Sequence, residues 1–181
     1  IGDVTGDATN EVVVGMNKIY CFDGIRGSIL WTKRVGGDIA TSIAISDVNN
    51  DGKNEILAGI SNNDARVCCL NGDDGDVIWE HTRAWRGGAS FRTLCIDNFN
   101  SDPYQEIVVE GNKNDPYGLM CLSGYDGRIL WTWKEPTGSF QAILSVDIIP
   151  DIPGKEIIAG GVGGVYCLNP EDNPPTGGRI L

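Results

Sequence analysis

The chain has few basic residues and one histidine. Its 181 residues contain 14 Lys plus Arg against 25 Asp plus Glu, a formal net charge of −11. Such a chain, with scattered basic residues, is repelled by the phosphates of nucleic acids and by anionic lipid surfaces. We therefore expect no nucleic-acid partner. The surplus of carboxylates suits multivalent cations, although acidity can equally serve solubility alone.

Long apolar runs are also absent. No run approaches the ~18 residues of a membrane-spanning helix, so we expect no membrane span. The apolar runs are short, such as EVVVG, EILAGI and EIVVEG, and they alternate with turns drawn from 25 glycines. This pattern is typical of an all-β protein.

A complete catalytic set is not evident. His81 is the only histidine, and no Ser or Cys in a nucleophile context accompanies it. We interpret His81 as a surface residue after a strand. The sequence favours a protein without catalytic residues, although it leaves the question of enzyme activity open.

One unit occurs four times along the chain. Its acidic loop reads DVTGDATNEVVVG, DVNNDGKNEILAG, DNFNSDPYQEIVVEG and DIIPDIPGKEIIAG, from Asp3, Asp47, Asp97 and Asp147. The spacings are 44, 50 and 50 residues. A second element follows each loop: YCFDGIRGSILW, CCLNGDDGDVIW, MCLSGYDGRILW and YCLNPEDNPPTGGRIL.

Each full unit reads as four short strands, which is the sequence signature of a propeller blade. A solenoid or a sandwich is the structural alternative. We predict an all-β β-propeller with blades of four-stranded antiparallel sheets at about 1–36, 37–86, 87–136 and 137–181. We expect an arc of a larger propeller of about six to eight blades, partnered by the remaining blades of a parent chain. The opening strand of the first blade and the closing strand of the fourth should then be absent or unpaired.

Two parts of the repeat resemble known families. The acidic loops followed by EIxxG are similar to the FG-GAP (integrin α-type) calcium loops of β-propellers. The C-[FL]-[DNS]-G-x-x-G-x-[IV]-[LI]-W element resembles the tryptophan motif of PQQ-like, quinoprotein-type propellers. Together they cover essentially the whole chain, and they imply the fold more specifically than the function, since such propellers serve as adhesion modules, scaffolds and enzymes.

The second loop fills every position of the calcium template. Its oxygens come from the side chains of Asp47, Asn49, Asp51 and Glu55 and from the carbonyl of Lys53, with Gly52 at the turn. Three carboxylates with amide and carbonyl oxygens suit six- or seven-coordinate Ca²⁺ better than Mg²⁺. The alternative is a solvated turn rich in Asn, Asp and Gly.

The first loop offers a weaker set. It supplies Asp3, Thr5, Asp7, the Thr9 carbonyl and Glu11, with Ala8 where glycine is expected. In the third and fourth loops nine residues instead of eight separate the first Asp from Glu, and Phe99 and Ile149 stand at the third position. We predict that these two loops bind no metal and are stiffened by Pro103, Pro150 and Pro153.

The cysteines and tryptophans recur with the repeat. Cys21, Cys69, Cys121 and Cys167 share one position, and equivalent positions in successive blades lie too far apart for a disulfide, so we predict buried thiols, with Cys95 buried as well. A vicinal Cys68–Cys69 disulfide, known in some quinoprotein dehydrogenases, is the alternative that the resemblance implies. Trp31, Trp79 and Trp131 are predicted to be packing anchors between blades.

Candidate ligand-binding residues lie in the variable loops between blades. These are Trp85, Arg86, Phe91, Arg92, Trp133 and Phe140. Aromatic rings beside guanidinium groups can bind sugars or anionic groups, and packing at the rim or against a missing blade is the alternative.

We therefore predict a non-catalytic, calcium-binding propeller module that acts as a scaffold or binds a protein or carbohydrate ligand. Weak calcium loops favour the extracellular space or the cell surface, whereas free cysteines favour a reducing setting. The alternative is a fragment of a propeller enzyme, either PQQ-dependent dehydrogenase-like or polysaccharide-degrading.

Overall fold

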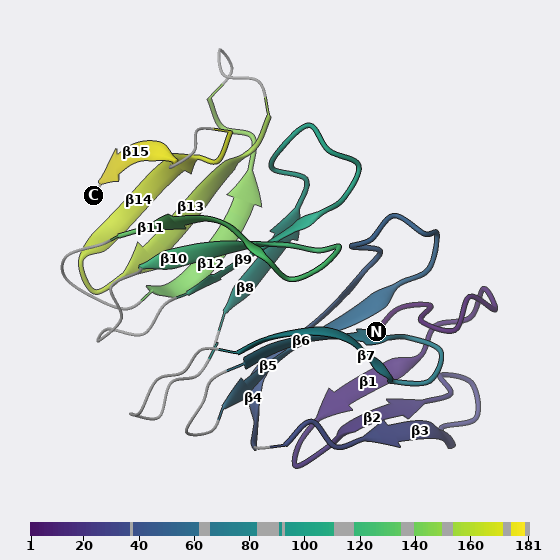
Figure 1. Cartoon of the computed structure of the whole chain (residues 1–181). Coiled ribbons are helices and arrows are strands. Elements are labelled where there is room, and N and C mark those ends of the chain that lie inside the picture. Colours follow the sequence, from purple (N-terminus) through teal and green to yellow (C-terminus); the bar gives the residue numbers. More distant parts are fainter. Residues whose placement is uncertain are drawn as a thin grey trace. The chain divides into compact units, whose positions relative to one another are not determined.

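The structure is a computed structural model. It describes residues 1–36, 38–61, 66–82, 91, 93–110, 118–134, 140–149, 154–171 and 175–179. These residues form strands and turns (Figure 1). Within those ranges there is no helix, and hence none with the length and apolar character needed to cross a membrane.

Four antiparallel sheets follow one another along the chain. The first contains β1 (Val12–Gly15), β2 (Ile19–Phe22) and β3 (Ile29–Lys33), and the second contains β4 (Asp38–Ser46), β5 (Glu55–Ser61), β6 (Arg66–Asn71) and β7 (Val77–Thr82). The third contains β8 (Leu94–Asp97), β9 (Glu106–Glu110), β10 (Leu119–Ser123) and β11 (Ile129–Trp133). The fourth contains β12 (Phe140–Val146), β13 (Glu156–Gly161), β14 (Gly164–Asn169) and β15 (Thr176–Arg179). Consecutive strands pair in each sheet, which confirms the predicted all-β repeat of antiparallel sheets.

The two ends of the repeat differ from each other. The first sheet has three strands. Its opening strand was predicted to be absent or unpaired, and among the described residues an isolated bridge between Gly2 and Glu11 is found in its place. The prediction that the fourth sheet lacks its closing strand is wrong, because β15 pairs with β14 from Asn169↔Thr176 to Tyr166↔Arg179. The TGGR segment can extend as a strand without the tryptophan that ends the other copies.

The register explains why cysteine and tryptophan recur together. Cys21, Cys69 and Cys121 on the third strands lie directly opposite Trp31, Trp79 and Trp131 on the fourth strands. A register shift follows each pair, between Cys and the next residue, which marks a β-bulge in the same place of three sheets. The small thiol leaves room for the large ring across the strands.

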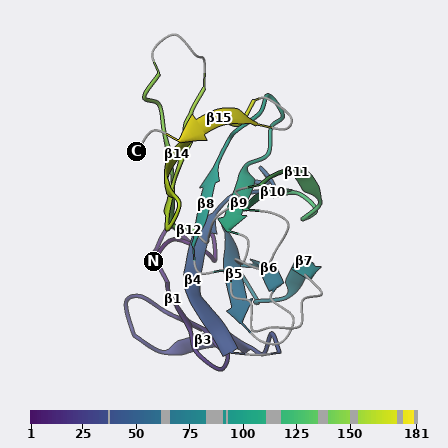
Figure 2. The same cartoon turned by 90° about the vertical axis from the view of Figure 1, so that its left-hand side faces the viewer.

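The chain forms two compact units, residues 1–92 and 93–181. In the first unit β1 lies against β4, and in the second β12 lies against β8 and β9 (Figure 2). Each unit has a core of its own between its two sheets. The first core includes Val4, Ile19, Cys21, Ile56 and Leu70, and the second includes Phe99, Cys121, Trp131, Phe140 and Leu168.

All six cysteines are free thiols, as predicted from their position in the repeat. Burial raises the pKa of Cys21 to about 11 and that of Cys68 to about 12, so these thiols stay protonated and unreactive at neutral pH. The alternative of a Cys68–Cys69 disulfide is not what the structure contains.

Candidate functional site

A buried glutamate closes every acidic loop. Glu11, Glu55, Glu106 and Glu156 are each no more than 3% exposed. Their Oε2 atoms accept backbone N–H groups from the start of the loop: Val4 at 2.9 Å, Val48 at 3.1 Å, Phe99 at 2.7 Å and Ile148 at 2.9 Å. A hydrogen bond from a backbone amide to a carboxylate is charge-assisted and therefore strong. The shared role of this glutamate is therefore to fix the loop backbone.

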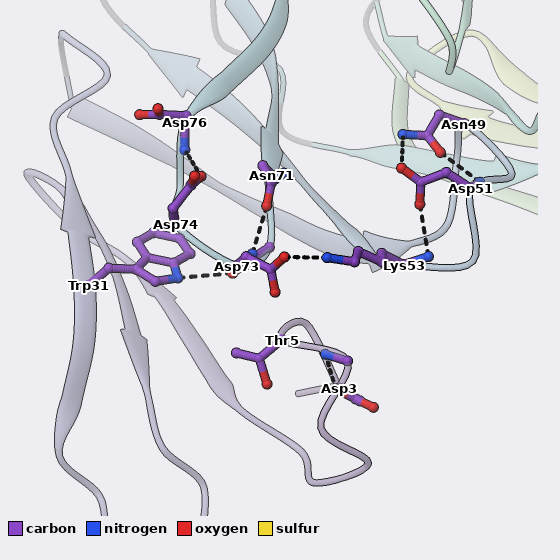
Figure 3. A network of polar contacts seen from close by, with 12 residues as sticks. Asp3, Thr5, Trp31, Asn49, Asp51, Lys53, Asn71, Asp73, Asp74 and Asp76 are labelled. Carbon is purple, nitrogen blue, oxygen red and sulfur yellow. Dashed lines mark hydrogen bonds and ion pairs between the residues drawn. The ribbon is translucent and has the colours of Figure 1, made fainter.

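The second loop folds its remaining oxygens back onto its own backbone. Asp47 accepts the amides of Asp51 and Gly52 at 3.1 and 2.9 Å, through Oδ1 and Oδ2 respectively. Asp51 Oδ1 in turn accepts the amide of Lys53 at 2.9 Å (Figure 3). Gly52 has a φ of +89°, a conformation that favours glycine. These bonds hold a tight turn whose carboxylates lie near one another.

The first loop repeats this arrangement with one strained residue. Asp3 accepts the amides of Gly6 and Ala8 at 2.7 and 3.0 Å, and Asp7 accepts the amide of Thr9 at 2.8 Å. The side-chain and backbone hydrogen bonds from Thr9 lower the pKa of Asp7. Ala8 adopts a φ of +66°, which is costly for a residue with a Cβ.

The donor set of the second loop suits calcium chemically, but the site is not preassembled. Burial, together with the negative charges of Asp51 and Asp47, raises the pKa of Glu55 to about 7. Negative charge is thus concentrated in the loop, beside the ammonium group of Lys53. Yet among the residues that the structure describes, no three His, Cys, Asp or Glu side chains are grouped so as to hold a metal ion. The Asp oxygens are directed to backbone amides instead, and calcium binding stays a prediction.

The third loop keeps more of the pattern than its sequence spacing indicated. Asp102 accepts the amide of Tyr104 at 2.9 Å, and Asn100 accepts that of Asp102 at 2.6 Å. Asp51 and Asn49 make the same two bonds in the second loop. Counted back from the glutamate, the extra residue therefore lies at the start of the loop, and the rest of the turn is retained.

Counted back from its glutamate, the fourth loop has Ile148 where the second loop has Asp47. Both Ile148 and Ile149 donate their amides to Glu156 Oε2, at 2.9 and 3.2 Å. Pro150 and Pro153, which were predicted to stiffen this loop, lie outside the described residues. Lys155 of the same loop forms an ion pair with Asp97 at 2.8 Å.

A tryptophan joins the two blades of the first unit. Trp31 Nε1 donates to the carbonyl oxygen of Gly72, in the turn between β6 and β7, at 2.9 Å. Lys53 of the second acidic loop forms an ion pair with Asp73 of the same turn (Figure 3). The acidic loop and the tryptophan contact therefore meet at one turn, which confirms that Trp31 anchors one blade on the next.

The second unit contains a pocket at the corresponding place. Its volume is about 240 Å³. The residues that line it are Phe99, Asn100, Glu106, Leu130, Trp131, Pro170 and Glu171. It combines apolar walls with a buried carboxylate, and the sequence patterns did not indicate it. The one available signal was Pro170, which stands where the other turns have glycine.

The predicted ligand-binding residues are not seen together on a surface. Phe91 and Phe140 are 2% exposed and belong to the interior of their units. Trp133 packs against Phe140 and Tyr166, with ring centroids 6.0 and 5.3 Å apart. Trp85, Arg86 and Arg92 lie outside the described residues. Ligand binding by this set stays a prediction, and for Phe91 and Phe140 the packing alternative has direct support.

Comparison with solved structures supports the fold. The chain is similar to quinohemoprotein alcohol dehydrogenase ADHIIG from Pseudomonas putida HK5 (TM-score 0.68, 14% identity, 94% of this chain and 33% of that one). It is also similar to BamB from Moraxella catarrhalis (TM-score 0.61, 14% identity, 96% of this chain and 46% of that one). A third similar structure is the exotype rhamnogalacturonan lyase YesX (TM-score 0.62, 17% identity, 90% of this chain and 28% of that one). The chain thus spans less than half the length of each. At these identities the likeness shows the fold alone.

Sequence comparison is more specific. No curated protein matches the chain significantly. The family model for the lambda-carrageenase beta-propeller domain matches residues 18–117, more than half of the chain. The propeller part of the predicted resemblance is thereby confirmed, as a partial β-propeller, while its FG-GAP part stays a prediction. The chain belongs to the lambda-carrageenase β-propeller domain family.

Proposed function

We propose that the chain is a non-catalytic part of the propeller domain of an extracellular polysaccharide-degrading protein, where it binds carbohydrate and serves as a scaffold. The observation that carries this proposal is the family match over residues 18–117, because that family is named for a carrageenase. The likeness to a rhamnogalacturonan lyase agrees with it at the level of the fold.

The cysteines of the chain are not activated nucleophiles. Five of the six cysteines are buried and Cys167 is half-buried, and burial raises the pKa of their thiols, so they are poor nucleophiles. His81, which was predicted to be a surface residue after a strand, lies instead within β7 and is half-buried. Cleavage of the polysaccharide is therefore assigned to other parts of the protein, and calcium in the first and second loops is assigned a structural role.

The second candidate is a dehydrogenase-like propeller, favoured by the likeness to ADHIIG and by the tryptophan repeat. A quinone cofactor would need polar ligands directed into a common cavity. The described pocket is lined by apolar groups, one amide and two carboxylates, which offers no cationic group for a quinone's oxygens. The carbohydrate role is the better supported of the two.

Binding of the purified chain to a panel of soluble polysaccharides tests the proposal. We expect saturable binding of a galactan, either neutral or anionic as in carrageenan, measured by affinity electrophoresis and calorimetry, and no binding of a quinone cofactor. Because the chain carries a net charge of −11, binding of an anionic polysaccharide should strengthen as salt screens the repulsion. No binding to any polysaccharide, at low or high salt, would overturn the proposal.

A further inference from the structure

The pocket of the second unit exists because one inter-blade contact is changed. In the first unit, a Cβ at Gly75 would lie 2.7 Å from the Trp31 ring, so the indole sits directly on the turn. The place of Gly72 is taken by Pro170 in the fourth copy. Among the described residues, Trp131 Nε1 makes no bond to the Pro170 carbonyl that would match the Trp31 bond to Gly72. The space between Trp131 and this turn is the pocket.

The polar groups of the pocket include both acceptors and a donor. Glu106 is 1% exposed and uses Oε1 to accept Asn100 Nδ2 at 2.8 Å, while Oε2 accepts the amide of Phe99. Each carboxylate oxygen has a second lone pair, so Glu106 can accept further hydrogen bonds. Glu171 at the rim is a second acceptor, and the Trp131 indole is a donor.

The remaining wall is apolar and the volume is small. Phe99, Leu130 and Pro170 line it beside the indole. At about 240 Å³ it falls just below the range of roughly 300–1,000 Å³ typical of pockets for drug-sized ligands. One six-membered ring is therefore the largest ligand that it can enclose. Hydroxyl groups both donate and accept, and a sugar ring also has apolar C–H faces, so a sugar matches every wall.

The charge of the pocket selects among sugars. The lining contains no basic side chain, its rim residue Glu171 is an exposed carboxylate, and the whole chain is acidic. An acidic ring would therefore meet the like charge of Glu171 and no cation, which is unfavourable. We propose that this pocket binds a single neutral sugar ring, such as one unit of a polysaccharide. This inference rests on the proposed carbohydrate role and places a sugar-binding site between the third and fourth blades.

Titration of the labelled chain with monosaccharides tests the site. The probes are galactose, rhamnose and, as the charged control, galacturonate, and the readout is the indole N–H signal of Trp131, assigned with Trp131→Phe. We expect the neutral sugars to shift this signal saturably and galacturonate to bind with at least about fivefold lower affinity. Shifts confined to other residues would overturn the site.

Variants connect the pocket to polysaccharide binding. Leu130→Trp should fill the pocket, and Glu171→Gln should replace the charged hydrogen-bond acceptor at the rim with a neutral one. Each should weaken the binding of a neutral polysaccharide by about fivefold or more. The matched control is Asp73→Asn, at the position equivalent to Glu171 in the second blade, which should leave binding unchanged. Glu171 is exposed, so Glu171→Gln stays informative even where Leu130→Trp fails to fold.

The outcomes separate the site from the wider function. Polysaccharide binding that Leu130→Trp and Glu171→Gln leave intact would overturn the pocket and keep the carbohydrate role. A saturable monosaccharide shift at Trp131 without polysaccharide binding would keep the pocket and overturn the wider role. Absence of both would overturn both.

Discussion

The indole nitrogen of Trp31 donates a hydrogen bond to the carbonyl oxygen of Gly72 over 2.9 Å, from the last strand of one sheet to a turn of the next. The ring also covers Gly75, whose φ of +74° and close approach to the indole both require glycine. A tryptophan and two glycines therefore form one contact between successive blades. The third and fourth blades differ, because Pro170 stands in the place of Gly72 and, in the part of the chain that the structure describes, the matching bond from Trp131 is not made.

Gly75→Ala should destabilise the chain by about 1–3 kcal/mol, because the new Cβ would clash with the Trp31 ring and because alanine is unfavourable at this positive φ. Trp31→Ala should cost about 3–5 kcal/mol through the void that it leaves between the blades. Equilibrium urea unfolding measures both. The control is Gly27→Ala, which has a similar φ of +67° but no atom within 4 Å, so its cost contains the backbone component alone. Equal losses for Gly75→Ala and Gly27→Ala would contradict the contact.

The repeat made the blades and their anchors predictable, because strand alternation and turn glycines are local in sequence. Local patterns were insufficient for the glutamates. Glu55 was predicted to be a metal ligand because of its loop, whereas Glu156 recurs in a loop that departs from the calcium template, and that recurrence was a signal for the additional structural role of this glutamate. The pocket depends on how Trp131 meets a turn 40 residues away, which a sequence pattern does not give.

Insertions limited the loop assignments in the same way. Counting forward from Asp97 displaced every later residue of the third loop by one. The hydrogen bonds count back from Glu106, because the buried carboxylate fixes the end of the loop and leaves its start free to absorb a residue. The loops therefore align from the buried glutamate at their end, and sequence spacing alone does not show which end of a loop is fixed by packing.

Glu156→Ala should cost about 1–3 kcal/mol, because it leaves the part-buried amides of Ile148 and Ile149 without their acceptor. Glu156→Gln keeps an acceptor oxygen and should cost clearly less. Thermal and urea unfolding of both variants would test this, with the exposed Glu171→Ala as a control that should change stability by less than about 0.5 kcal/mol. If Gln and Ala were equally harmful, the charge and not the bond would be the important feature.

Stability should fall as pH rises from about 5 to 7, in part through Glu106. Burial, with a smaller contribution from Asp102, raises the pKa of Glu106 from 4.5 to about 7. The folded state then holds this proton more tightly than the unfolded state, so its stabilising effect is complete below about 4.5 and is lost as pH rises through 7.

Glu106→Gln cannot titrate and should flatten that pH dependence. Melting temperatures from pH 4 to 8, in the presence of a chelator so that no cation competes, would measure the difference between variant and wild type. Parallel profiles for the two proteins would show that Glu106 stays charged across this range.

Calcium should stabilise the fold through the second acidic loop. Asp47, Asp51 and Glu55 place three carboxylates in one tight turn, and their mutual repulsion is part of what raises the pKa of Glu55. Binding would require Asp47 and Asp51 to share their oxygens between the backbone amides and the ion, which a carboxylate with two lone pairs on each oxygen can do. The unfolding midpoint should then rise with the logarithm of calcium concentration above the dissociation constant.

Asp51→Ala removes one of these carboxylates at an exposed position, so it should abolish most of the calcium-dependent rise without harming the core. Asp74→Asn, exposed in the neighbouring turn, is the matched control and should keep the full rise. Asp102→Ala was expected from the sequence spacing to have no effect. Because Asp102 makes the same loop bond as Asp51, any part of the rise that it removes would assign calcium to the third loop as well. Identical melting temperatures for wild type in calcium and in chelator would show that the loops are turns closed by hydrogen bonds alone.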